Sequence, residues 1–328
     1  MIDVSIIVPI YNTEKYLSKC LNSLVNQNYS KDRYEIYLIN DASTDKSLEI
    51  IKKYQKKYPN IVLYNSKINH GVSYSRNIGI KNSKGKYLMF CDADDTYDEK
   101  AISIFMNIIN EQKADFVMAD YYIENDKGKF SAGTTNYYQN NQITKKEIIS
   151  YMSLTSCSKI IKKDLFIKYH LFYDEDVKRC EELSVILPLA YYANNPIVIK
   201  DNLYYYYQRK TSASNSNTEK EEKDILYFNI TLDRFIKKIN SDKYPEEMEF
   251  RAIDHLLYGK SLVILKSKMK RKILLKHIND FKKQYPKFIK NSYLKNYRLP
   301  KRLFVYCLNY KLIILCKFFA FLHKKVTG

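Results

Sequence analysis

Hydrophobic residues form continuous runs and helically spaced sets in turn along the first 115 residues. The run "VSIIVP" (4–9) is apolar without interruption and ends in proline, which predicts a buried strand. The segment 12–27 follows with a capping Asn12 or Thr13 and predicts an amphipathic helix. Its apolar residues at helical spacing are Leu17, Cys20, Leu21, Leu24 and Val25. The same strand and helix pair repeats at 34–40 with 45–58, at 61–65 with 71–80, and at 87–91 with 98–109.

This alternation predicts an α/β fold. The strands are hydrophobic at successive positions, so both faces of the sheet are expected to be covered, as in a parallel sheet between helices. From about Asp115 the units become less regular. Polar side chains follow three of the strands: Tyr11 and Asn12, then Asn40 and Asp41, then 92–95. Loops at the carboxyl ends of parallel strands converge on one crevice, so we expect these side chains to share a site.

The segment "DADD" (92–95) places three carboxylates in four positions. Like charges so close repel one another, and a divalent cation with oxygen ligands would relieve that repulsion while neutralising a phosphate. A plainer interpretation remains open, in which the segment is a solvated turn and Asp95 caps the next helix. Likewise "NDASTD" (40–45) is typical of an ordinary turn with Ser43 as a helix N-cap.

Charge divides the chain into two parts. Its 328 residues carry a formal net charge of +19, of which residues 1–200 contribute +3 and residues 201–328 contribute +16. Residues 260–328 hold 19 basic side chains and one acid, which predicts an anionic partner. The six cysteines contain no C-x-x-C pair, which argues against a zinc site or a disulfide framework and favours small buried side chains in a reducing cytoplasm. The opening residues show no secretion signal.

Four linked motifs resemble the inverting family 2 glycosyltransferases with the GT-A fold: "VSIIVPIYNTEKYLSKCLNSLVNQNY", "EIYLINDASTDKS", "NHGVSYSRNIGI" and "GKYLMFCDADD". A weaker continuation to about residue 215 is similar to the acceptor half of bacterial members that build surface polysaccharides. The resemblance implies a GT-A domain over 1–215, with a mostly parallel sheet flanked by helices. Within it, 1–115 would be the nucleotide-binding half and 116–215 the acceptor half. Beyond residue 215 the resemblance gives no guidance, and the charge and hydrophobic pattern predict a helical basic C-terminal region over 216–328.

The resemblance also assigns the nucleotide side of the site. The positions that line the base and ribose match Pro9, Tyr11 and Asn12, and Asp41 matches the acid that hydrogen-bonds uracil. Asn40 and Ala42 depart from the commoner Asp and Gly. Arg76 matches an arginine near the diphosphate, although a surface helix arginine is the alternative.

The remaining assignments concern the metal and the reaction. Asp92 matches an acid near the ribose and metal, and Asp94 matches the ligand of a divalent cation, Mn²⁺ or Mg²⁺. The expected general base lies in a Glu-Asp pair, for which this chain has Glu181 and Glu182; Glu182, the second, is expected to act, with Glu181 as the alternative. Surface acids that cap a helix are the plainer interpretation. Arg209, with Tyr207 and Ser212, falls where the family often places a loop over the diphosphate.

The C-terminal segment 300–326 reads as about 20 mostly apolar residues flanked by lysine and arginine. Charges inside it disfavour a membrane span, and the wheel of a single helix gathers Arg302, Asn309, Lys317 and Lys324 on one side. We therefore predict a helix lying on an anionic cytoplasmic membrane surface. A helical domain that forms homo-oligomers through an amphipathic interface is the alternative.

Together these observations predict an enzyme that moves a hexosyl or N-acetylhexosaminyl group from a UDP-sugar to a hydroxyl. The acceptor would be a glycan or a lipid-linked sugar in bacterial cell-surface polysaccharide synthesis, on the inner face of the membrane. The Glu-Glu pair leaves open a non-catalytic, glycosyltransferase-like partner subunit. A nucleic-acid-binding protein would suit the charge and the 32 tyrosines, but no motif for it is present. The sugar, the linkage and the number of additions stay undecided.

Overall fold

The computed structural model describes residues 1–126, 128–177, 181–208, 243–266 and 271–327, with Thr231, Arg234, Phe235 and Ile239 between them. The chain forms two compact units. The first comprises residues 1–148 and 152–212, and the second comprises 149–151 and 213–328. Each unit is described by itself below.

The first unit is built on one mixed sheet with the strand order β3-β2-β1-β4-β8-β6-β9-β5, and β7 pairs with β6. Its strands are β1 (Val4–Ile10), β2 (Tyr34–Asp41), β3 (Ile61–Ser66), β4 (Tyr87–Phe90), β5 (Thr96–Tyr97), β6 (Phe116–Asn125), β7 (Gly128–Ser131), β8 (Lys159–Lys162) and β9 (Pro196–Tyr207). Its helices are α1 (Glu14–Val25), α2 (Ser47–Lys57), α3 (Val72–Asn82), α4 (Ala101–Gln112), α5 (Lys145–Tyr151, whose last three residues belong to the second unit), α6 (Lys163–Lys168) and α7 (Leu183–Tyr192).

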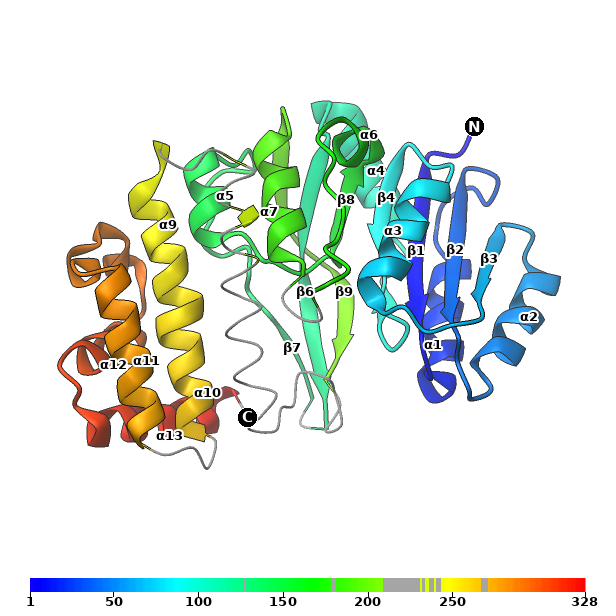
Figure 1. Ribbon diagram of the computed structural model, residues 1–328. Coiled ribbons are helices and arrows are strands. Elements are labelled where there is room, and N and C mark those ends of the chain that lie inside the picture. The colour runs from blue at the N-terminus through cyan, green and yellow to red at the C-terminus, as the bar shows by residue number, and fades with distance from the viewer. Residues whose placement is uncertain are drawn as a thin grey trace. The chain divides into compact units, whose positions relative to one another are not determined.

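Helices cover both faces of this sheet (Figure 1). Successive side chains of a strand point to opposite faces, and β1 shows the division clearly. Ile6 and Val8 belong to the buried core that includes α1 and α4. Ile7 points the other way, toward α3, where a Cβ on Gly79 would lie 2.4 Å from it. Glycine at position 79 therefore lets α3, which carries Arg76, lie directly on the strand.

The predicted strands and helices of the first 115 residues are confirmed. All five apolar residues of the predicted first helix are fully buried on α1. Strands β3, β2, β1 and β4 pair in parallel, as the continuous runs indicated. Beyond β4 the pairing changes, because β8 runs antiparallel to both β4 and β6, while β6 and β9 are parallel. The irregular sequence after Asp115 corresponds to this mixed half.

The second unit is helical in the residues described. It contains α9 (Pro245–Ala252), the π-helix η2 (Ile253–Gly259), α10 (Lys260–Lys266), α11 (Arg271–Gln284), the short 3₁₀ helices η3 (Phe288–Lys290) and η4 (Ser292–Asn296), α12 (Leu299–Asn309) and α13 (Ile313–Thr327). Half-buried Asp254 of η2 pairs with Lys301 of α12, which lowers the pKa of Asp254 to about 2 despite the opposing effect of partial burial.

The single helix predicted over 300–326 is wrong. The segment forms α12 and α13, and Lys311 between them adopts a left-handed conformation with φ of 56°. The polar side drawn on one continuous wheel therefore does not exist. Within the part of the chain that the structure describes, no helix combines the length and apolar character needed to cross a bilayer.

The prediction that the cysteines are small buried side chains is confirmed for the five that the structure describes: Cys20, Cys91, Cys157, Cys307 and Cys316. Cys180 lies outside the described residues. Burial raises the pKa of the Cys91 and Cys157 thiols well above the usual value, so the neutral form is favoured.

Candidate active site

The loops that follow β1 and β2 are joined by hydrogen bonds. Asn12 Oδ1 accepts from the Thr44 amide at 2.8 Å, and Ser43 Oγ accepts from the Asn12 amide at 3.1 Å. Ser43 thus serves this junction rather than an N-cap, because α2 begins only at Ser47. Tyr11 remains half exposed at the carboxyl edge of the sheet, beside partly buried Pro9 of β1. Tyr11 and Asn12 therefore lie on a loop that these hydrogen bonds hold in place, directly after β1, the strand that contains Pro9.

The helix α1 begins at Glu14, and neither predicted cap serves it. Thr13 precedes the helix but makes no side-chain cap bond. Instead Asp45 Oδ2, from the loop after β2, accepts from the Glu14 amide at 2.9 Å. The first helix thus receives its cap from the neighbouring loop, which a local sequence pattern does not reveal.

Asp41, at the end of β2, is buried and holds the loop that leads into α3. Its Oδ1 accepts from the His70 amide at 2.9 Å and its Oδ2 from the Gly71 amide at 2.7 Å. The next residue, Ala42, has φ of 57°, a left-handed conformation that glycine adopts without strain. This geometry explains why family members commonly have glycine there. The bond from Asp41 to uracil stays a prediction.

The segment after β4 separates its three carboxylates. The side chain of Asp92 is 41% exposed, and Asp94 is partly buried. Asp95 is buried and accepts from the Tyr204 hydroxyl at 2.6 Å and from the Tyr207 amide at 2.7 Å. Burial, reinforced by the charges of Asp92 and Asp94, raises the pKa of Asp95 to about 8.

Asp95 therefore does neither of the two things expected of it. It does not cap a helix, because α4 begins at Ala101 after Lys100. It is also bound to β9 through its two oxygens, so it does not join the other two acids around a shared cation. Asp92 and Asp94 remain the two acids to which the resemblance assigns the metal.

These two residues fit a hard divalent cation that is held partly by its substrate. The residues that the structure describes contain no group of three His, Cys, Asp or Glu side chains arranged around a metal position. Mg²⁺ and similar cations usually bind through one or two carboxylates and complete their shell with water and substrate phosphates. Asp94, with Asp92 beside the guanidinium of Arg76, provides such a pair.

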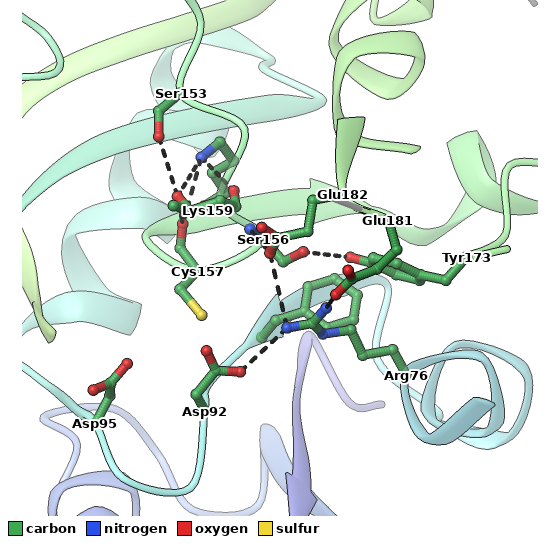
Figure 2. Close-up of polar contacts among 12 residues, drawn as sticks. Arg76, Asp92, Asp95, Ser153, Ser156, Cys157, Lys159, Tyr173, Glu181 and Glu182 are labelled. Carbon is green, nitrogen blue, oxygen red and sulfur yellow. Dashed lines mark hydrogen bonds and ion pairs between the residues drawn. The ribbon is translucent and has the colours of Figure 1, made fainter. Parts of the chain in front are cut away.

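Arg76 of α3 contacts acids that are far apart along the chain, Asp92 on one side and Glu181 and Glu182 on the other (Figure 2). Its Nη1 is 2.8 Å from Glu181 Oε1, and its Nη2 is 3.2 Å from Asp92 Oδ1 and 3.8 Å from Glu182 Oε1. The guanidinium is buried, which by itself lowers the pKa of Arg76, but the neighbouring carboxylates raise it well above its usual value. The alternative of a surface arginine is wrong, because Arg76 is buried. A buried charge is stable only with partners, and the three carboxylates provide them.

The two glutamates before α7 have different surroundings. Glu181 is bound to Arg76, and its side chain is 12% exposed. Glu182 is 26% exposed, and its Oε1 accepts from the Ser156 amide at 2.6 Å. Within the described ranges its Oε2 has no hydrogen-bond partner. Burial and the charge of Glu181 raise the pKa of Glu182, against the lowering effect of Arg76. Glu182 thus offers an oxygen that can accept a proton.

The structure adds three residues that sequence reasoning missed. Tyr173 lies with its ring 5.2 Å from the Arg76 guanidinium carbon, and its hydroxyl is 2.7 Å from Ser156 Oγ. Lys159 is buried, and its Nζ donates to the Thr155 carbonyl at 2.6 Å, behind the Ser156 loop. Burial lowers the pKa of Lys159 to about 8. No spacing marks Tyr173 or Ser156, because Arg76 and Glu182, which they contact, lie far away along the chain.

Arg209 and Ser212, predicted to cover the diphosphate, lie outside the described residues. Tyr207, at the end of β9, is bound to Asp95 through its amide.

The family model for glycosyl transferase family 2 matches residues 5–169, half of the chain. The chain belongs to glycosyl transferase family 2. This matched range holds every nucleotide-side and metal residue named above except Tyr207, Arg209 and Ser212.

Relatives and solved structures agree with this membership. The minor teichoic acid biosynthesis protein GgaB of Bacillus subtilis is 31% identical over 241 residues, which cover 72% of this chain and 26% of GgaB. The poly(ribitol-phosphate) beta-N-acetylglucosaminyltransferase TarP of Staphylococcus aureus is 27% identical over 305 residues, covering 88% of this chain and 90% of TarP. The crystal structure of S. aureus TarS 1–349 in complex with UDP-GlcNAc superposes with a TM-score of 0.72 at 22% identity, covering 99% of this chain and 92% of that chain.

This family 2 chain therefore has the GT-A fold seen in TarS, with a helical C-terminal region. It spans between a fifth and about a third of the length of several curated relatives.

Proposed function

We propose that this family 2 protein is an inverting, metal-dependent glycosyltransferase that uses a UDP-sugar donor. The observation that carries the proposal is the position of Glu182. Its carboxylate and that of the donor-side residue Asp92 lie around one guanidinium at the carboxyl edge of the sheet. With Glu182 as the proton acceptor and Asp92 as a metal-binding acid, one site would hold both groups that a single displacement requires, which supports the proposal.

The acceptor hydroxyl is a poor nucleophile, so its proton must be removed as it attacks the anomeric carbon. Glu182 Oε2 would take that proton while Oε1 stays bound to the Ser156 amide. Attack from the face opposite the diphosphate inverts the anomeric centre. A bound divalent cation, held by Asp94 with Asp92, would supply Lewis-acid stabilisation of the departing diphosphate. Pro9, Tyr11, Asn12 and Asp41 would hold the nucleoside at the edge of the sheet.

The relatives support the substrate class. GgaB is named for teichoic acid synthesis, TarP for transfer of N-acetylglucosamine to poly(ribitol phosphate), and TarS 1–349 was solved with UDP-GlcNAc. We therefore assign a hexosyl or N-acetylhexosaminyl donor and a hydroxyl of a bacterial surface glycan or its lipid-linked precursor. An active site with this arrangement disfavours the alternative of a non-catalytic subunit.

We further propose that the C-terminal unit binds an anionic cytoplasmic membrane surface. Helix α13 buries Ile313, Cys316 and Ala320, and it exposes a second apolar set, here called the α13 face: Ile314, Leu315, Phe318 and Phe321, between 46% and 85% exposed. The 19 basic residues after position 260 supply attraction to anionic lipid. Lys311 is exposed at the turn between α12 and α13 and need not be accommodated within an apolar helix.

The enzymatic proposal is tested by incubating the purified chain with UDP-, GDP- and CMP-sugars and Mn²⁺ and measuring nucleotide release. We expect release from a UDP-sugar, loss of release in EDTA and in Asp94→Asn, and normal release in the control Glu99→Gln. Glu99 is an exposed acid five residues farther along the chain. Equal activity of wild type in EDTA would contradict the metal mechanism.

A further inference from the structure

Both terminal nitrogens of Arg76 are engaged by carboxylates of the protein. The residue is 4% exposed; Nη1 contacts Glu181, and Nη2 contacts Asp92 and Glu182. Its Nε is buried without a hydrogen-bond partner among the residues described. A guanidinium that served mainly to bind a diphosphate would be expected to direct terminal N–H groups toward the substrate. Here they point to the acids of the site itself.

Tyr173 closes a ring of contacts around the base. Its ring lies against the Arg76 guanidinium, and its hydroxyl is 2.7 Å from Ser156 Oγ. The Ser156 amide donates to Glu182 Oε1 at 2.6 Å, and Glu182 Oε1 returns to Arg76 at 3.8 Å. The ring therefore runs Arg76, Glu182, Ser156, Tyr173 and back to Arg76 (Figure 2).

Asn77, the neighbour of Arg76 on α3, fixes Tyr173 from the other side. Its Nδ2 donates to the Tyr173 carbonyl and its Oδ1 accepts from the Tyr173 amide, both at 2.9 Å. Helix α3 thus holds Tyr173 by its backbone as well as by its ring. Helix α3 packs on β1. The contacts of Asn77 and Arg76 therefore fix the position of Tyr173 relative to the parallel strands of the sheet.

We infer that Arg76 and Tyr173 are positioning residues that hold Glu182 and Asp92 at a fixed separation, an assignment that rests on the proposed function. Arg76 sets this separation directly, because the same Nη2 lies beside both carboxylates. Tyr173 sets the orientation of Glu182 through Ser156. A displacement of about 1 Å in a catalytic group lowers the rate by about 100-fold, so the effect belongs to turnover and not to donor affinity.

The test compares Arg76→Lys and Tyr173→Phe with wild type in kcat and KM for UDP-sugar turnover and in Kd for UDP with Mn²⁺, by calorimetry. Lysine keeps the charge but reaches one carboxylate, and we expect kcat to fall about 100-fold. Phenylalanine keeps the ring and removes the bond to Ser156, and we expect kcat to fall about tenfold. UDP affinity should stay within about threefold in both. Tyr169→Phe is the matched control and should retain wild-type kcat, because the Tyr169 ring stacks on Tyr192, away from this ring of contacts.

Tyr173→Phe decides the matter by itself if Arg76→Lys fails to fold, which thermal unfolding reveals. Unchanged kcat in Tyr173→Phe would overturn the inference for Tyr173, and loss of UDP affinity with normal kcat in Arg76→Lys would make Arg76 a diphosphate ligand. A wild-type protein that binds UDP but turns over no sugar nucleotide would overturn the proposed function and this inference together. The wild-type measurement thus separates the two failures.

Discussion

Glu182→Gln and Glu181→Gln should affect different properties: the first should lower kcat, and the second should lower the free energy of unfolding. Glu182→Gln keeps the shape and the Oε1 acceptor for the Ser156 amide, which lies 2.6 Å away in the wild type. It removes the proton acceptor and weakens the 3.8 Å ion pair with Arg76, so kcat should fall by about 10² to 10⁴ while UDP affinity is retained. Burial raises the pKa of Glu182. As the pH is lowered, the wild-type rate should therefore begin to fall at a higher pH than an exposed glutamate would give. Glu182→Gln should lose this acid limb.

Glu181→Gln changes the ion pair with Arg76, whose atoms are 2.8 Å apart. Glutamine can still accept from the charged guanidinium but no longer neutralises it, so unfolding should become easier by about 1–2 kcal/mol. Urea unfolding measures this loss, and kcat should change by less than about tenfold. If Glu181→Gln abolishes turnover and Glu182→Gln does not, the roles assigned to the pair are reversed. If both variants turn over normally, neither residue is the base.

Three further outcomes test other parts of the structure. Ala42→Gly should raise the free energy of unfolding by about 0.5 kcal/mol, because relief of left-handed strain exceeds the added freedom of the unfolded chain; a lower urea midpoint would contradict this. Replacing every residue of the α13 face by asparagine should release the protein from phosphatidylglycerol vesicles at low salt. Ile68→Asn, at another exposed apolar position, should not release it. If the α13 variant instead dissociates an oligomer, the α13 face binds a second copy of the chain. Burial and Arg251 lower the pKa of His255 to about 4. The contribution of His255 to the free energy of unfolding should be complete above pH 6.5 and decline by up to about 1.4 kcal/mol per pH unit toward pH 4. His255→Asn should remove this slope, and the control His70→Asn should retain it.

The fold of residues 1–115 could be predicted closely, because the sequence signals for its strands and helices are local. Each strand there is a continuous apolar run, each helix shows its buried stripe, and parallel strands bring their carboxyl ends to one edge. Asp92 and Arg76 come together in the structure for this reason. The acceptor half was less predictable, because its antiparallel pairings join β4 to β8 and β6 to β8 across long stretches of chain.

The errors have the same physical origin. Nothing in "DADD" shows that Asp95 binds Tyr204 and the Tyr207 amide, which lie more than 100 residues later. The helical wheel over 300–326 assumed unbroken geometry, whereas Lys311 turns the chain. Ser156 acts through its amide, which every residue except proline possesses, so its contact with Glu182 leaves no signal in the sequence.

The configuration of the released sugar tests the central claim most directly. The purified chain is incubated with UDP-α-N-acetylglucosamine and UDP-α-glucose, with Mn²⁺ and water as acceptor, and the anomeric proton is followed by ¹H NMR before mutarotation. A single displacement assisted by Glu182 predicts that the β-anomer appears first, and that Glu182→Gln suppresses its formation. Initial release of the α-anomer would contradict the inverting mechanism.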